Sequence, residues 1–267
     1  KHLGKAFLGL ALGLVWLIPF YLMLTNSFKT KQEIFTNPLK FPEAFTFENY
    51  PEAFRQLDFI RTLANSLLIT VSSVIIIVIF SAMAAYALER IKSKFSTVTF
   101  MVFVAAMLVP FQSVMIPLVA LFGKAQMLNQ IGIIFMYLGF GGSMSIFLYH
   151  GAMKSIPRAL DEAAIIDGAS RWQVFWKVIF PMLKPTTVTV AVLNTMWIWN
   201  DYLLPSLVIN SPTTQTIPLK MFFFFGQYTK QWHLALAGLV IAILPVIIFY
   251  FFMQKQIIKG VADGAVK

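Results

Sequence analysis

The chain has 267 residues, of which 58% are hydrophobic and only 12% are charged. Soluble domains carry about 25% charged residues, so water could not solvate this surface and lipid must cover much of it. The net charge of +10 does not indicate nucleic-acid binding, because the basic residues fall between apolar runs and form no continuous stripe. The absence of cysteine excludes disulfides, thiolate metal sites and cysteine nucleophiles.

A membrane-spanning helix needs about 20 mostly apolar residues, and six segments of the chain meet this requirement. The third and fifth segments contain prolines or polar residues, which membrane helices tolerate where neighbours or a cavity satisfy the freed backbone groups. No small-residue cleavage site follows the first segment, so we expect a retained span. The sequence predicts an all-α membrane protein with six transmembrane helices over residues 6–24, 67–88, 98–122, 131–149, 186–207 and 234–253.

The distribution of Lys and Arg between these spans predicts their orientation. Six spans place both termini on one side, and the segments on that side hold 13 of the 21 Lys and Arg residues. Segments rich in these residues stay in the cytoplasm. We therefore expect a multi-pass protein of a bacterial or archaeal cytoplasmic membrane, with both termini inside and one domain over residues 1–267. Its longest cytoplasmic loop would be 150–184.

This loop has the pattern of two short helices with a break between them. Ser155 could cap the first helix, and Gly168 suits a left-handed residue that ends it. Ser170 could cap the second helix, which Pro181 would end. Such a helix of small residues between two spans could enter a groove of a partner protein. It could equally lie on the lipid headgroups, and the residues alone leave both alternatives open.

The spacing of residues in this loop resembles the signature of binding-protein-dependent importer permeases. That signature is Glu-Ala-Ala, three residues, Gly, nine residues, an aliphatic residue, one residue, Leu and Pro. The chain departs from it by Val178 in place of isoleucine and by Phe180 in place of leucine. The matching positions are Glu162, Ala163, Ala164, Gly168 and Pro181, and Asp167 resembles the usual continuation.

The resemblance implies that the first short helix is a coupling helix that docks into a cytoplasmic ATPase. Glu162 would contact the ATPase, Ala163 and Ala164 would pack closely against it, and Gly168 would make the turn. It also implies a second homologous permease subunit, two ATPase subunits and an extracytoplasmic solute-binding protein. We expect this chain to bind no cofactor itself, and ATP and Mg to lie on the partner ATPase subunits.

Further segments resemble the carbohydrate-uptake branch of this family, in particular the maltose-type second permease. They are 109–112 with 116–117, 199–202 with Pro205, and the tail 260–267. The resemblance implies that the cargo is a sugar or oligosaccharide, with a path formed together with the second permease. A non-sugar cargo for the same kind of importer is the alternative.

Polar and aromatic residues in the third and fifth spans are the candidates for contact with cargo. Polar groups inside a membrane are costly and often face a cavity or a partner. Aromatic rings pack against the C–H faces of sugars, and a few polar groups bind their hydroxyls. The same residues could instead form interfacial aromatic belts or join helices. The candidates are Gln112, Asn194, Trp197, Trp199, Asn200, Asp201 and Tyr202.

The chain has no Gly-rich nucleotide-binding sequence of the P-loop type, so we do not expect it to be an ATPase or another enzyme. Its three histidines are far apart and predict no metal site. The alternative function is a stand-alone secondary carrier or channel for a small polar solute. Ion-coupled carriers usually place charged residues deep in their spans. Here only Asp201 comes near the membrane interior, which argues against a carrier.

Overall fold

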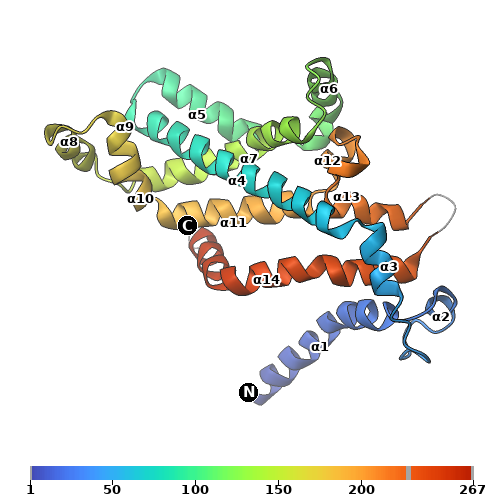
Figure 1. Ribbon diagram of the computed structural model, residues 1–267. Helices are drawn as coiled ribbons and strands as arrows, with labels where there is room; N and C mark the ends of the chain where they lie inside the picture. The colour runs from blue at the N-terminus through green and yellow to red at the C-terminus, as the bar shows by residue number, and fades with distance from the viewer. Residues whose placement is uncertain (1, 227–229, 266–267) are drawn as a thin grey trace. The chain divides into compact units, whose positions relative to one another are not determined.

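The computed structural model describes residues 2–226 and 230–265, and these are mainly helical (Figure 1). Four helices are long and apolar enough to cross a membrane, with spans at Gly9–Asn26, Phe59–Arg90, Gln130–Met153 and Trp232–Lys255. Two further pairs of helices qualify only if each bent pair counts as one span. The prediction of an all-helical membrane protein is confirmed, with four to six candidate spans. The last residues of the expected tail 260–267 lie outside the described part.

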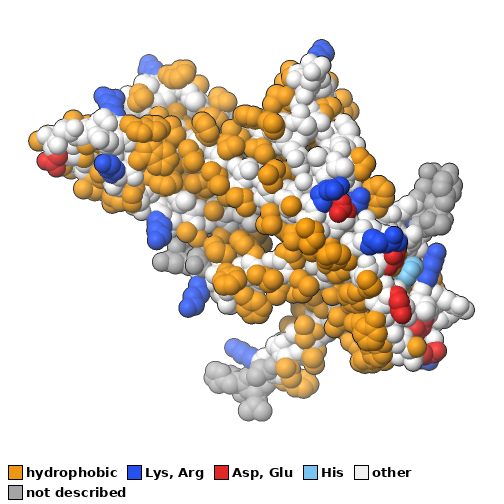
Figure 2. All heavy atoms as spheres, in the orientation of Figure 1, with side chains coloured by type: hydrophobic (Ala, Val, Ile, Leu, Met, Phe, Trp, Pro, Cys, Tyr) orange, Lys and Arg blue, Asp and Glu red, His pale blue; other side chains and the backbone are white. Residues whose placement is uncertain are grey.

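The hydrophobic side chains cover much of the surface in Figure 2, and the charged side chains gather mainly at helix ends and in connecting segments. On α1 (His2–Asn26), for example, Phe7 and Trp16 are exposed. Monomeric soluble proteins rarely expose apolar surface on this scale. Lipid or partner subunits must therefore cover these helices.

The third expected span, 98–122, is not one continuous helix. The structure divides it into α5 (Lys94–Ala106) and α6 (Phe111–Lys124), which meet at 105°. Pro110 stands at the N-cap of α6, with extended backbone. Proline lacks the N–H that would continue α5, and it biases the residue before it away from helical conformation. The break thus has a local cause, whereas Pro117 lies inside α6.

The fifth expected span, 186–207, is also interrupted. The helix α11 (Lys184–Asn200) ends before Asp201, whose backbone is extended, and α12 (Leu203–Val208) follows. The Asp201 carboxylate accepts a hydrogen bond from the backbone N–H of Leu203 at 3.0 Å. An aspartate that binds a backbone N–H two residues later favours a turn over helix continuation.

The chain divides into two compact units. The first comprises Lys1–Leu63 and Thr216–Phe251 and contains α1, α2 (Lys31–Thr36), α3 (Asn49–Gln56), α13 (Ile217–Met221), η3 (Phe222–Phe224) and most of α14 (Trp232–Ala265). The fully buried Lys29 organises the segment after α1, because its ammonium donates to the side chain of Asn26 and to the carbonyls of Asn37, Pro38 and Lys40.

The second unit, Ala64–Gln215 and Phe252–Lys267, holds both candidate sites. It contains most of α4 (Phe59–Arg90), α5, α6 and α7 (Gln130–Met153), followed by α8 (Ala159–Ile166). A bent segment then runs through α9 (Arg171–Gln173), the π-helix η1 (Val174–Ile179) and α10 (Phe180–Met182) to α11. The short helix η2 (Pro212–Thr214) follows α12, and the end of α14 also belongs to this unit. The core of this unit lies between α7, α4 and α11, where Ile77, Tyr137, Tyr149 and Val190 are fully buried.

Candidate functional site

The loop between α7 and α11 forms the two short helices that the sequence predicts. The helix α8 ends at Ile166, and Gly168 follows with φ of +86°, in the left-handed region. Ser170 caps the next helix through a capping box with Gln173. These two predictions are confirmed. The expected capping by Ser155 was wrong, because its hydroxyl donates to the carbonyl of Ala152 while α8 begins after Arg158 without a side-chain cap.

The base of this loop is aromatic, and it differs from the predicted regular helix. Residues Val174–Ile179 form a π-helix, and Pro181 lies within the following turn, so that the bend of 76° comes between Met182 and Lys184. Proline cannot donate a backbone hydrogen bond, which disturbs the helix that precedes it. The rings of Phe175 and Trp176 are 4.9 Å apart at their centroids, and Phe175 also packs on Tyr86 of α4 at 5.4 Å.

A buried ion pair attaches α8 to the end of α4. The Asp161 carboxylate lies 2.8 Å from the Arg90 guanidinium, and both side chains are nearly buried, at 11% and 13% exposure. The Tyr86 hydroxyl donates to the same carboxylate at 2.8 Å. A second arginine, Arg158, donates to the carbonyl of Glu89 at 2.6 Å. These contacts hold α8 at the end of α4, beyond the candidate span (Figure 1).

The opposite side of α8 is open. Glu162 and Ala163 are exposed, Ala164 is partly buried, and Asp167 and Gly168 are exposed just after the helix. Ile165 and Ile166 are exposed by 50% and 85%. The structure thus places Glu162, Ala163, Ala164, Asp167 and Gly168 together on an exposed surface of acidic and apolar groups. Pro181 is also exposed, but it lies after the turn that separates α8 from α9.

Asp161 was not among the residues singled out from the sequence. Adjacent residues on a helix point about 100° apart, so Asp161 and Glu162 face different surroundings. The structure turns Asp161 inward and Glu162 outward. The sequence does contain one signal for this role. Two acids are adjacent in a short helix, and such a helix must pack one of its faces against the rest of the protein.

Two of the cargo candidates meet in a cavity next to the break between α5 and α6. The cavity has a volume of about 260 Å³ and is lined by Met107, Phe140, Gly141, Met144, Leu193, Asn194 and Trp197. Asn194 is buried and donates to the hydroxyl of Ser145 at 3.1 Å, so that it also joins α11 to α7. Trp197 is 42% exposed and packs edge-on against Tyr137, with 5.4 Å between ring centroids.

The other cargo candidates do not line this cavity. Asp201 accepts a hydrogen bond from the buried Tyr137 hydroxyl at 2.9 Å. The Asn200 amide donates to the carbonyl of Met196 in its own helix, and Gln112 is exposed in the first turn of α6. Trp199 and Tyr202 are partly buried. The arrangement therefore favours Asn194 and Trp197 among the seven candidates, and it gives Asp201 structural contacts.

Comparison with known proteins identifies the family. Residues 77–263 match the binding-protein-dependent transport system inner membrane component family. The chain is 58% identical, over 98% of its length and 95% of the relative, to a probable starch degradation products transport system permease protein, AmyC, of Thermoanaerobacterium thermosulfurigenes. It is 36% identical, over 96% of its length and 93% of the relative, to the multiple sugar-binding transport system permease protein MsmG of Streptococcus mutans.

A solved structure supports the same assignment. The chain resembles a crystal structure of a bacterial ABC transporter involved in the import of the acidic polysaccharide alginate, with a TM-score of 0.79 and 25% identity, covering 95% of both chains. The family match extends over the loop that carries the coupling signature and over both bent helix pairs. The chain therefore belongs to the family of inner-membrane components of binding-protein-dependent transport systems, the permease subunits of ABC importers.

Proposed function

We propose that this chain forms, with a second homologous permease, the membrane path of an ATP-driven importer for a sugar or oligosaccharide. The observation that carries the proposal is the free acidic and apolar face of α8, which the Asp161–Arg90 ion pair holds outward. A helix with such a face, fixed at the end of a span, suits docking into a groove of a partner. ATP and Mg would be bound by two cytoplasmic ATPase subunits that receive this face.

The distribution of Lys and Arg supports a cytoplasmic position for α8 and for both termini. Thirteen of the 21 Lys and Arg residues fall on the side of the α8 loop and of both termini, which favours the cytoplasm for that side. The extracytoplasmic side would then face a solute-binding protein. When the ATPases close around ATP, they would move α8, and the bent helix pairs beside the cavity would change its access from one side to the other.

The cavity chemistry supports a carbohydrate cargo. An indole ring that is partly exposed and a buried amide next to it supply a flat apolar surface and a polar anchor. Pockets for small ligands combine apolar walls with a few fixed polar groups of this kind. The similarity to a permease for starch degradation products makes starch fragments the first cargo to test.

The coupling function can be tested with the complex purified through a tag on this chain. We expect ATPase subunits to co-purify, and Gly168→Pro to lose them, because proline cannot adopt the positive φ of this position. Glu162→Ala should weaken coupled ATP hydrolysis, whereas Glu48→Ala, at an exposed acid far from α8 in sequence, should not. If the chain transports without any ATPase and ignores both substitutions in the α8 loop, it is a stand-alone carrier.

The cargo assignment can be tested by uptake of labelled maltotriose into proteoliposomes or cells that contain the whole importer. Trp197→Ala should reduce uptake by about fivefold, since the loss of an aromatic contact costs about 1 kcal/mol. Trp16→Ala removes an indole on α1 that is exposed by 76%, against 42% for Trp197, and it serves as the control. Uptake of a non-sugar solute in preference to every oligosaccharide would leave the permease assignment intact and refute the sugar cargo.

A further inference from the structure

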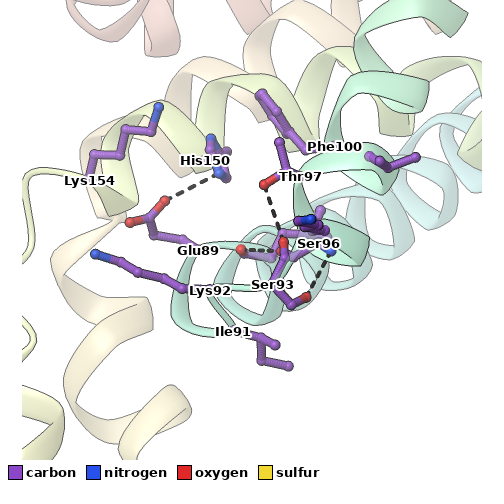
Figure 3. Close-up of a pocket in the computed structure, with 12 residues that line it drawn as sticks. Glu89, Ile91, Lys92, Ser93, Ser96, Thr97, Phe100, His150 and Lys154 are labelled. Carbon is purple, nitrogen blue, oxygen red and sulfur yellow. Dashed lines mark hydrogen bonds and ion pairs between the residues drawn. The ribbon is translucent and has the colours of Figure 1, made fainter.

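A second pocket of the second unit is separate from the cargo cavity. It lies where α4 ends, α5 begins and α7 ends, and it has a volume of about 710 Å³ (Figure 3). Its lining comes from residues 88–100 and from His150 and Lys154. Two candidate membrane spans, Phe59–Arg90 and Gln130–Met153, end at this pocket. The pocket therefore lies at the boundary between hydrocarbon and water.

The charged groups around this pocket favour an anion. Lys92, Lys94 and Lys154 line it, and Lys154 and Lys92 are exposed. Glu89 is the single carboxylate among the lining residues, and its oxygen lies 3.2 Å from the Nε2 atom of His150. The imidazole of His150 is held in turn by the Phe100 ring, which stacks on it with centroids 3.9 Å apart. Three lysines against one carboxylate leave the lining with an excess of positive charge, even though the contact with the imidazole does not remove the charge of Glu89.

The remaining lining combines apolar and hydroxyl side chains. The apolar residues are Leu88, Ile91, Val98 and Phe100, and the hydroxyl residues are Ser93, Ser96 and Thr97. The apolar surface continues outward along one face of α5, where Phe95, Val98 and Val102 are exposed by 80%, 61% and 61%. Residues three and four positions apart lie on the same face of a helix, so these side chains form a stripe that begins at the pocket.

We infer that this pocket binds an anionic phospholipid of the cytoplasmic leaflet. The lysines would contact the phosphate of the headgroup, and the acyl chains would lie along the apolar walls and the exposed stripe of α5. Basic pockets between membrane helices on the cytoplasmic side suit such headgroups. A soluble phosphate would leave the apolar stripe uncovered, and a docked acidic peptide would not explain why the stripe runs toward the membrane interior.

The test is native mass spectrometry of the full chain in detergent, titrated with phosphatidylglycerol or phosphatidylcholine of the same acyl chains. We expect phosphatidylglycerol to bind more tightly. The triple variant Lys92→Gln, Lys94→Gln, Lys154→Gln should weaken that binding by about fivefold for each lysine removed, since each lysine near an anionic surface contributes about 1 kcal/mol. The matched control Lys31→Gln, Lys124→Gln, Lys230→Gln removes the same charge elsewhere and should bind as the wild type does.

A second variant and a competitor distinguish the contribution of the acyl chains from that of the headgroup phosphate. Val98→Asn should reduce phosphatidylglycerol binding while it leaves the three lysines in place, and circular dichroism verifies that each variant is folded. Glycerol 3-phosphate, which has the headgroup phosphate without acyl chains, should not compete. Full competition by it would mean that the pocket takes a soluble phosphate. Equal affinity for both lipids, or equal loss in the control triple variant, would also overturn the inference.

Discussion

Removing the carboxylate of Asp161 should detach α8 from the rest of the protein. Asp161→Ala deletes the partner of Arg90 in a pair whose side chains are only 11% and 13% exposed, together with the hydrogen bond from Tyr86. The guanidinium would keep two long hydrogen bonds to the carbonyl of Ile156, both at 3.4 Å, and its position over the Tyr86 ring, 5.8 Å from the ring centroid. Breaking a buried ion pair on one side costs about 3 kcal/mol or more, because a buried charge loses its partner.

Such a change multiplies the equilibrium constant for local opening of α8 by about 100, since each 1.4 kcal/mol is a factor of ten. Hydrogen exchange measured by mass spectrometry on peptides that cover Ala159–Ile166 reports this opening directly. The variant Asp161→Asn should lie between wild type and Asp161→Ala, because its amide can still accept from the Tyr86 hydroxyl.

The neighbouring acid supplies the control. Glu162 is exposed, so Glu162→Ala should leave exchange in α8 unchanged while it weakens coupling to the ATPase. The reasoning would be refuted if Asp161→Ala left α8 as protected as the wild type. It would also be refuted if both alanine variants accelerated exchange to the same extent, since the two acids would then have equivalent roles.

Three further outcomes can be checked by denaturant unfolding or hydrogen exchange. Gly168→Ala should destabilise the α8 loop by about 1 kcal/mol, because a side chain is strained at φ of +86°; unchanged exchange in this loop would contradict it. Gly141→Ala should destabilise the contact between α7 and α11, because the new Cβ would lie 2.5 Å from the Asn194 side-chain oxygen, whereas Gly151→Ala meets no atom within 4 Å and serves as the control. Burial lowers the pKa of Lys29 below its usual 10.5, so between the lowered pKa and 10.5 the unfolded chain binds a proton that the folded chain lacks. Stability of the segment after α1 should therefore rise with pH across that window, and Lys29→Met should abolish the slope.

Local features of the sequence were sufficient to predict several parts of the structure. Composition and the length of the apolar runs predict membrane helices, because a span needs its apolar residues to be consecutive. The left-handed turn at Gly168 and the cap at Ser170 depend on backbone preferences of single residues and were predicted correctly. The signature spacing from Glu162 to Pro181 predicted the family, and the match over residues 77–263 confirms it.

The bends were harder to predict from the same residues. The third span was expected as one segment over residues 98–122, and the structure instead turns the chain by 105° at Pro110. The sequence shows that proline interrupts the hydrogen bonds of a helix, but the size of the turn depends on what the two halves pack against. The interruption at Asp201 was missed because a single aspartate can end a helix or lie within it, depending on which donors surround it.

The roles of the polar residues depend on contacts between segments that are distant in the chain. Tyr86 and Asp161 are 75 residues apart, and Asn194 and Ser145 are 49 apart. The periodicity of the sequence is sufficient to identify a helix and its apolar positions. Which of two adjacent acids is buried, and which polar residues share a cavity, are properties of packing, because they depend on how each helix is rotated against its neighbours. Only the tertiary structure could therefore turn Asp161 inward, leave Glu162 free and bring Asn194 and Trp197 into one cavity.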